Sequence, residues 1–250
     1  MIQSYQRPSI LDDTLHSIFE DESSQLDAVI VVWNDPESKA PDNWVSPGGI
    51  PLKFRQSQEN SLNQKLKVDP DIRTKAVLLG DDDTYYTKSD MEYAFKIWRE
   101  MGQNRLVGAW PRAARLTEQG TYRYGIPTTQ MDYNMILTGL AFTHIAFMDY
   151  YSSDDRIMSA VRRYVDRHFN CEDIAMNFMT QSLTGCPPMF VKGQNGAMQT
   201  EKPEGTPRIG KGRPHAKRRN QCLVDFEFFF KKWPLKMQEG YFVQAEINAP

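Results

Sequence analysis

Runs of apolar residues separated by turn signals predict the strands of this chain. Residues 28–34 are apolar, rich in β-branched side chains and followed by a proline turn, which is typical of a buried parallel strand. Residues 1–5 and 50–54 are two further strand candidates. A fourth candidate, residues 76–80, runs directly into three consecutive aspartates.

Apolar positions at helical intervals predict four helices. Pro8 suits the first turn of the first helix. Ser89 and Glu92 have the spacing of a capping box, and apolar residues recur at helical intervals up to Trp98. The other two helices are expected over residues 157–165 and 173–183.

The order strand, helix, strand, strand, helix favours an α/β fold, in which a mostly parallel sheet carries helices on both faces. We expect one domain that covers residues 1–250. Residues 111–132 and 193–215 are rich in Gly, Thr, Tyr or Pro and are predicted to be irregular binding loops, the second of them the more mobile.

Composition excludes several classes of protein. The chain has 250 residues, of which 40% are hydrophobic, so it can bury a core, and disorder is excluded. A formal charge of -2 gives no overall attraction to nucleic acid or to acidic membranes. No apolar stretch approaches the ~20 residues of a membrane span. No signal peptide is visible, and we expect the chain to be a domain whose targeting sequence lies upstream.

Three cysteines leave the compartment open. Cys171, Cys186 and Cys222 do not have the clustered spacing of a zinc module. They are either three buried thiols of a cytosolic enzyme, or one disulfide and one free thiol in an oxidising compartment.

The acidic triplet is the strongest chemical signal. Asp81, Asp82 and Asp83 repel one another and follow a buried strand, at the sheet edge where α/β proteins bind ligands. A hard divalent cation that bridges carboxylates and substrate phosphates would neutralise them. The alternative is a solvated acidic turn at a helix start.

Three weaker signals have structural alternatives. Glu172 and Asp173 suit the first turn of a helix, where ordinary capping is the simpler interpretation. Asn60 and Asn63 could present amides to a base or sugar, but helix capping by Asn60 is simpler. The basic stretch 208–219 is interpreted as a lid over a diphosphate or as a solvated face, and its histidine at 215 as an exposed loop residue.

Taken together, the chain resembles the glycosyltransferase domain at the carboxyl end of exostosins and in the core of exostosin-like proteins. The likeness extends from residue 1 to about 234. It rests on six segments in the family's order: MIQSYQR (1–7), VIVVWN (29–34), NSLN (60–63), DDD (81–83), LTG (137–139) and NCEDIAMNF (170–178).

The resemblance implies a GT-A fold with a Rossmann-like nucleotide-sugar half at about 1–105 and an acceptor half at about 106–250. It also implies a retaining reaction, a divalent cation, usually Mn²⁺, and a nucleotide-sugar donor. The implied roles are metal ligand for Asp83, donor or nucleotide contact for Arg7, Asn60, Asn63, Lys65, Asp81 and Asp82, catalysis for Asp173 and Arg219, and acceptor contact for Asn170. Lys65 stands where many members carry arginine.

The resemblance further implies a disulfide between Cys171 and Cys222, and hence the lumen of the Golgi or endoplasmic reticulum, with a membrane anchor outside this chain. The expected reaction moves an N-acetylhexosamine from a UDP-sugar to a hydroxyl of a glycan or glycolipid and forms an α-linkage. No nucleic-acid partner is expected, and a homodimer is left open. The alternatives are a pseudoenzyme or sugar-binding module and a nucleotidyltransferase.

Overall fold

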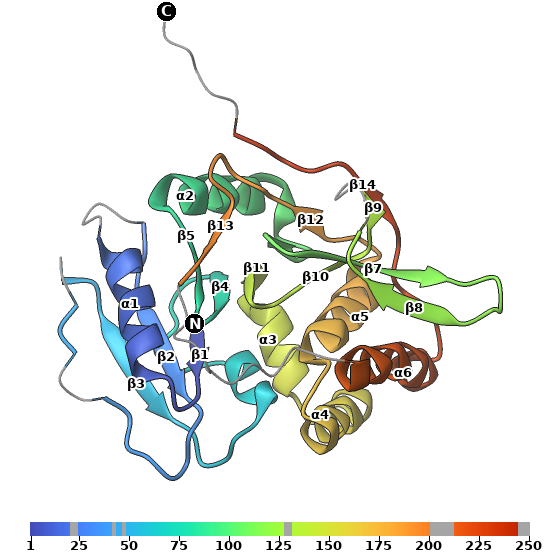
Figure 1. Cartoon of the computed structure of the whole chain (residues 1–250), viewed down its shortest axis with the longest axis horizontal. Helices are drawn as coiled ribbons and strands as arrows, with labels where there is room; N and C mark the ends of the chain where they lie inside the picture. The colour runs from blue at the N-terminus through green and yellow to red at the C-terminus, as the bar shows by residue number, and fades with distance from the viewer. Residues whose placement is uncertain (21–24, 42–43, 47–48, 128–131, 201–212, 245–250) are drawn as a thin grey trace, which may run out of the picture.

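The computed structural model describes residues 1–20, 25–41, 44–46, 49–127, 132–200 and 213–244. A seven-stranded sheet crosses the molecule in the order β12-β6-β11-β4-β1-β2-β3 (Figure 1). Its parallel part consists of four neighbouring strands, β4 (Ala76–Asp81), β1 (Ile2–Ser4), β2 (Val29–Trp33) and β3 (Leu52–Gln56). All four were predicted from the sequence.

The other side of the sheet comes from the second half of the chain. β11 (Leu140–His144) lies antiparallel to β4, and β6 (Val107–Gly108) lies antiparallel to β11. β12 (Met189–Phe190) is parallel to β6. Among the described residues, β11 is thus the one strand of this sheet that runs against the rest. The expected mostly parallel sheet is confirmed, and both expected halves contribute strands to it.

Alternating side chains divide the core into two layers. Val77 and Leu79 of β4 face one cluster of buried residues, whereas Ala76 and Leu78 face another. The first layer contains α3 (Ile145–Ser152), α4 (Arg156–His168), α5 (Glu172–Thr184) and α6 (Arg213–Phe230). The opposite layer contains α1 (Pro8–Phe19), α2 (Lys88–Ile97) and the π-helical η3 (Trp98–Gly102). Helices on both faces are therefore confirmed (Figure 1).

The prediction that residues 111–132 form an irregular loop was wrong. It contains the antiparallel hairpin of β7 (Pro111–Leu116) and β8 (Tyr122–Gly125), and β7 also pairs with β10 (Met135–Ile136). Thr and Tyr are good strand residues, and Gly120, with a φ of +72°, supplies the turn. The composition that suggested a loop is therefore that of a short hairpin.

The second expected loop, 193–215, is also more regular than predicted. β13 (Ala197–Gln199) pairs with β5 (Thr84–Tyr86), the strand that follows the acidic triplet. α6 begins at Arg213, so the basic stretch is helical from that residue on. Residues 201–212 lie outside the described residues. One more strand pair, β9 (Asp132–Tyr133) with β14 (Gln238–Glu239), lies beside the β7–β10 sheet.

Two predicted helix caps were one or two residues out of place. Thr87, not Ser89, caps α2, because its hydroxyl accepts from the backbone N–H of Asp90. Ser61, not Asn60, caps the 3₁₀-helix η2 (Leu62–Leu66). Both caps are hydroxyl residues in non-helical backbone, which is the usual preference at this position.

A disulfide joins the two helices of the second half that carry predicted site residues. Cys171, just before α5, is bonded to Cys222 in α6 across 51 residues of sequence, and Cys186 is free. The expected pairing is therefore present. No helix in the described part of the chain is long and apolar enough to span a membrane.

Candidate active site

The acidic triplet lies at the carboxyl edge of the parallel strands. β4 ends at Asp81, the next two aspartates form a tight turn, and β5 begins at Thr84. We refer to residues 81–83 as the acidic turn. Gln3 of β1 pairs with Asp81, so the chain that leaves β1 passes directly beside the turn. Parallel strands therefore bring Arg7 to the aspartates across 75 residues of sequence.

Arg7 binds two of the three aspartates. The carboxylate of Asp82 is fully buried and accepts from the hydroxyl of Ser4 (2.6 Å) and from Nε of Arg7 (3.1 Å). Nη1 of Arg7 lies 3.3 Å from Oδ2 of Asp83. Burial raises the pKa of Asp82 to about 6, although Arg7 and Ser4 pull it down. Asp82 thus anchors Arg7. The donor or nucleotide contact of Asp82 stays a prediction.

Lys65 neutralises the first aspartate. Its ammonium lies 2.7 Å from Oδ1 of Asp81, and its side chain is only 3% exposed, whereas that of Asp81 is 47% exposed. Burial acts to lower the pKa of Lys65, but the charges of Asp81 and Glu172 outweigh it, and the pKa is raised. On the other side of the carboxylate, a Cβ on Gly139 would lie 2.6 Å from Oδ2 of Asp81. The LTG segment therefore leaves room for this carboxylate.

A second charged pair faces the site from α5 and α6. Nη2 of Arg219 lies 3.3 Å from Oδ2 of Asp173, and both side chains are largely buried. The guanidinium also donates to the hydroxyl of Tyr124 and lies over its ring, with Cζ 4.8 Å from the centroid. Burial acts to lower the pKa of Arg219, and the charge of Asp173 outweighs it, so the pKa is raised. Asp173 is an ion-pair partner rather than an ordinary helix cap.

Glu172 was considered in the sequence analysis and set aside as an ordinary capping residue, but the structure places it among the charged groups of the candidate site. Its side chain is half-buried beside Asp173. Burial and the charge of Asp173 raise the pKa of Glu172 to about 7, against the pull of Lys65. Lys65 interacts electrostatically with Asp81, Glu172 and Asp173, so it lies between the acidic turn and the start of α5. The position of Glu172 in a first helical turn concealed this role.

Unusual backbone sets the direction of α5. Phe169 and Cys171 have φ values of +48° and +78°, a left-handed conformation that few non-glycine residues adopt. The reversal between α4 and α5 buries Asn170 and turns Asp173 toward Arg219. Such local strain persists where the surroundings hold it, and here the disulfide at Cys171 does so. The acceptor contact of Asn170 stays a prediction.

Asn63 is held in the protein scaffold. Its amide donates to Oδ1 of Asp166 (2.7 Å) and to the carbonyl oxygen of Arg162 (3.0 Å), and its oxygen accepts from the hydroxyl of Tyr151 (2.7 Å). The structure therefore does not bring the Asn63 amide to the acidic turn. Asn63 therefore has a scaffold role, and its predicted nucleotide contact stays a prediction.

Asn60 and its partner Asn34 lie at the sheet edge. Asn60 is exposed and accepts from the side-chain amide of Asn34 at 2.7 Å. Asn34 directly follows β2, as Arg7 follows the end of β1 and Asp82 follows β4. Asn34 could therefore have been identified from its position after a strand, by the argument that identified the aspartates, but the sequence analysis did not apply that argument to it.

His215 is not the exposed loop residue that the sequence suggested. It lies in α6, one turn before Arg219, and is half-buried. Burial and the charge of Arg219 lower the pKa of His215, while Asp173 raises it. The histidine therefore belongs to the same charged surroundings as Asp173 and Arg219.

The donor groups fit a divalent cation that is shared with a phosphate ligand. No cluster of three or more His, Cys, Asp or Glu side chains occurs in the part of the chain that the structure describes, which excludes an all-protein cage there. Mg²⁺-like ions need only one or two carboxylates when phosphate oxygens supply further ligands. Asp83 at the turn, with Asp81 beside it, offers this set. Mn²⁺ itself stays a prediction.

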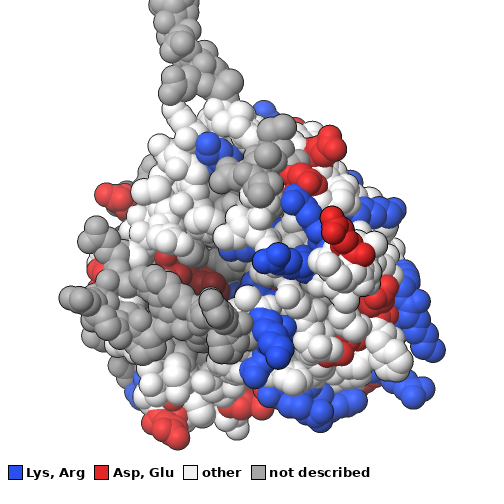
Figure 2. Space-filling model, turned by 45° about the vertical axis from the view of Figure 1, so that its right-hand side comes forward, with Lys and Arg blue, Asp and Glu red and all other residues white. Residues whose placement is uncertain are grey.

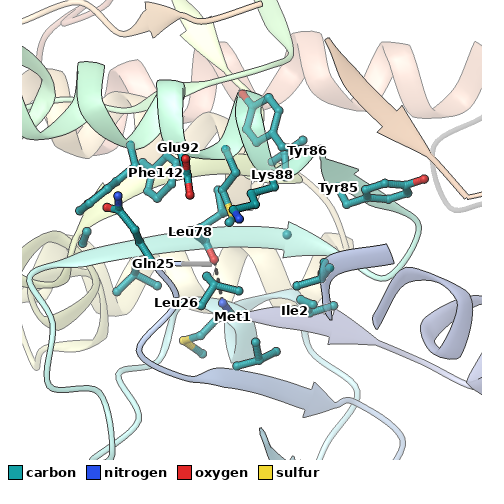
Figure 3. Close-up of a pocket in the computed structure, with 18 of the residues that line it drawn as sticks. Met1, Ile2, Gln25, Leu26, Leu78, Tyr85, Tyr86, Lys88, Glu92 and Phe142 are labelled. Carbon is teal, nitrogen blue, oxygen red and sulfur yellow. Dashed lines mark hydrogen bonds between the residues drawn. The ribbon is translucent and has the colours of Figure 1, made fainter. Parts of the chain in front are cut away.

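One face of the molecule has a hollow of mixed charge. Figure 2 shows acidic side chains at the floor of a hollow in the surface, with Lys and Arg side chains along one side of it. The large cavity between α1 and α2, of about 540 Å³, is a different feature (Figure 3). Its lining is mostly apolar and includes Leu78 and Phe142, whereas the three aspartates do not line it.

Comparison with known proteins identifies the family. The sequence model of the glycosyl transferase family 64 domain matches residues 1–245. The chain therefore belongs to this family, as the resemblance to exostosins predicted.

Three relatives illustrate how the family uses this domain. The chain is 36% identical over 202 residues to glucosamine inositolphosphorylceramide transferase 1 of Arabidopsis thaliana, which covers 79% of this chain and 26% of that protein. It is 32% identical over 248 residues to human exostosin-like 2, with 94% and 73% covered. It is 33% identical over 220 residues to human exostosin-2, with 86% and 30% covered. The chain thus spans only about a quarter of the plant relative's length.

Proposed function

We propose that this protein is a metal-dependent, retaining glycosyltransferase that moves a sugar from a nucleotide-sugar donor to a hydroxyl of a glycan or glycolipid. One observation carries the proposal. Lys65 forms an ion pair with Asp81 of the acidic turn and also interacts electrostatically with Asp173, the ion-pair partner of Arg219. The donor is a UDP-sugar and the transferred sugar an N-acetylhexosamine, in keeping with the glucosamine transferase among the relatives.

The charged groups are suited to a diphosphate leaving group. Bound at Asp83, the cation would supply Lewis-acid stabilisation of negative charge on the diphosphate. Arg219 is held charged by Asp173 and presents a planar fork of donors, the geometry that matches phosphate oxygens. Because its Nε is buried and has no partner among the described residues, it retains a donor for a ligand or water. Arg219 therefore stabilises the diphosphate as the bond to the sugar breaks.

Asp173 is the carboxylate nearest to this leaving-group arginine. In one route to retention its oxygen attacks the anomeric carbon as the diphosphate leaves, and the acceptor oxygen then displaces it. In the other, the carboxylate only stabilises positive charge at the anomeric carbon while the acceptor attacks from the face that the diphosphate leaves. Trapping a sugar on Asp173, detected by mass spectrometry, distinguishes the two routes.

The disulfide supports a place in the secretory pathway. Disulfides persist in oxidising compartments, and this one closes a long loop beside the site. We therefore propose that the protein acts in the lumen of the Golgi or endoplasmic reticulum, anchored through a segment outside this chain.

Measurement of donor hydrolysis tests the proposal. Protein made in an oxidising compartment is incubated with UDP-N-acetylglucosamine or UDP-N-acetylgalactosamine, with and without Mn²⁺, and released UDP is measured. We expect Mn²⁺-dependent release that Asp83→Ala reduces by at least about a hundredfold, while Asp154→Ala, at an exposed carboxylate outside the site, leaves it unchanged. Absence of release points to a binding module, and turnover of a sugar phosphate with a nucleoside triphosphate points to a nucleotidyltransferase.

A further inference from the structure

Two backbone carbonyls of the acidic turn are held by threonine residues. The hydroxyl of Thr14, which is fully buried in α1, donates to the carbonyl oxygen of Asp82 at 2.7 Å. The backbone N–H of Thr200 donates to the carbonyl oxygen of Asp83 at 3.0 Å. The turn is thus fixed from both sides, by α1 and by the residue that follows β13.

The two threonines are also bonded to each other. Their hydroxyl oxygens lie 2.6 Å apart. A threonine hydroxyl has one proton, and that of Thr14 is used on Asp82. The hydroxyl of Thr200 must therefore donate to Thr14, and the direction of both protons is determined. The two residues form a closed clamp around the backbone of the turn.

The far end of β13 is anchored to α2. Both carboxylate oxygens of the fully buried Asp90 accept backbone N–H groups, from Gln194 at 2.6 Å and from Asn195 at 2.9 Å. A Cβ on Gly193 would lie 2.4 Å from Oδ1 of Asp90, so only glycine fits this close approach. β13 is therefore fixed before it pairs with β5, which places Thr200 at the turn.

We propose that Thr14 and Thr200 are positioning residues that set the direction of the Asp83 carboxylate toward the cation of the donor. The two bonds to the carbonyls hold the backbone of the turn and so set the direction of the Cα–Cβ bond of Asp83, while Arg7 contacts its carboxylate. Three adjacent carboxylates repel one another, so a turn without this clamp would spread. This inference rests on the proposed function, because it assigns the cation to Asp83.

Threonine variants test the clamp with little change in volume. Thr14→Val removes the hydroxyl and leaves the carbonyl of Asp82 without its donor, whereas Thr14→Ser retains the hydroxyl. Thr200→Val removes only the bond between the hydroxyls and keeps the backbone N–H on Asp83. Thr143→Val is the matched control, since the hydroxyl of Thr143 is buried and has no partner among the described residues.

The measurement is Mn²⁺ affinity in the presence of UDP, by electron paramagnetic resonance of free Mn²⁺, together with the KM for Mn²⁺ in donor hydrolysis. We expect Thr14→Val to weaken Mn²⁺ binding about tenfold, the effect of one lost hydrogen bond between buried groups, and to retain kcat at saturating Mn²⁺. Thr14→Ser should recover wild-type affinity, and Thr200→Val should fall between. The proposal is wrong if wild type binds Mn²⁺ and both valine variants at 14 and 200 match it. If wild type binds no Mn²⁺ with UDP, the proposed cation site fails first.

Discussion

The raised pKa of Glu172 predicts that the folded protein becomes more stable when the charge of this carboxylate is removed. The half-buried carboxyl has a pKa raised from 4.5 to about 7, with burial as the main cause and Asp173 as the next. We expect Glu172→Gln, which keeps the shape and removes the titration, to be more stable than the wild type at neutral and alkaline pH. Proteins retain such destabilising groups where function needs them.

The sign follows from proton linkage. A carboxyl whose pKa is higher in the folded state binds its proton more tightly there, so its stabilisation is complete below pH 4.5 and is lost as the pH rises to about 7. A pKa raised to this extent corresponds to ~3 kcal/mol at most. Because Glu172 is only half-buried and Lys65 and Arg219 lie near it, we expect ~1 to 2 kcal/mol.

Urea unfolding of the wild type and Glu172→Gln between about pH 5 and pH 8 measures this effect. The stability of the variant relative to the wild type should increase with pH up to about 7 and then level off. Glu118→Gln, at an exposed glutamate in the β7–β8 turn, is the control for loss of one carboxylate. A stability difference that does not vary with pH would refute the reasoning, since it would mean that Glu172 titrates alike in both states.

Three further predictions concern the surroundings of the site. Arg219→Lys should lower kcat for donor hydrolysis by about 10²–10³, because an ammonium cannot reproduce the guanidinium fork, and initial rates at saturating donor measure this. Replacing Cys171 and Cys222 by serine should lower the free energy of unfolding by roughly 4 kcal/mol in urea titrations, with the free cysteine replaced as control. Gly139→Ala should raise the donor KM about tenfold, because its Cβ would displace the Asp81 carboxylate from Lys65, and donor titrations check this.

The sheet and its helices were predictable because burial determines their sequence pattern. Val29–Trp33 is buried along its whole length, and this gave an unbroken apolar run. The β7–β8 hairpin gave no such signal, since β8 is half exposed and the Gly residues in and near it are typical of turns. The start of α2 was misplaced at Ser89, because more than one hydroxyl residue near it could serve as the cap. In the structure Thr87 is the cap.

Site residues that lie just after a strand could be predicted from the sequence. Site residues whose neighbours come from distant elements could not. Asp81 to Asp83 were identified by their position after a buried strand. Glu172 and His215 were considered and set aside, because their surroundings come from Lys65, Asp173 and Arg219, which lie on different elements. Asn63 was assigned to the donor by the resemblance; its amide is bonded to Asp166 and Tyr151 within the protein, and the donor contact stays a prediction.

Lys65 links the two halves of the chain at the candidate site. It is buried between carboxylates of the first half, at Asp81, and of the second half, at Glu172 and Asp173. A buried ammonium is costly unless carboxylates compensate its charge, and those of Lys65 come from both halves of the chain. A cation bound at Asp83 would add positive charge beside Asp81, and the ammonium of Lys65 would then interact more strongly with the carboxylates of α5. Through Lys65, a cation on the Asp81 side would therefore be felt at Glu172 and Asp173, the carboxylates beside Arg219.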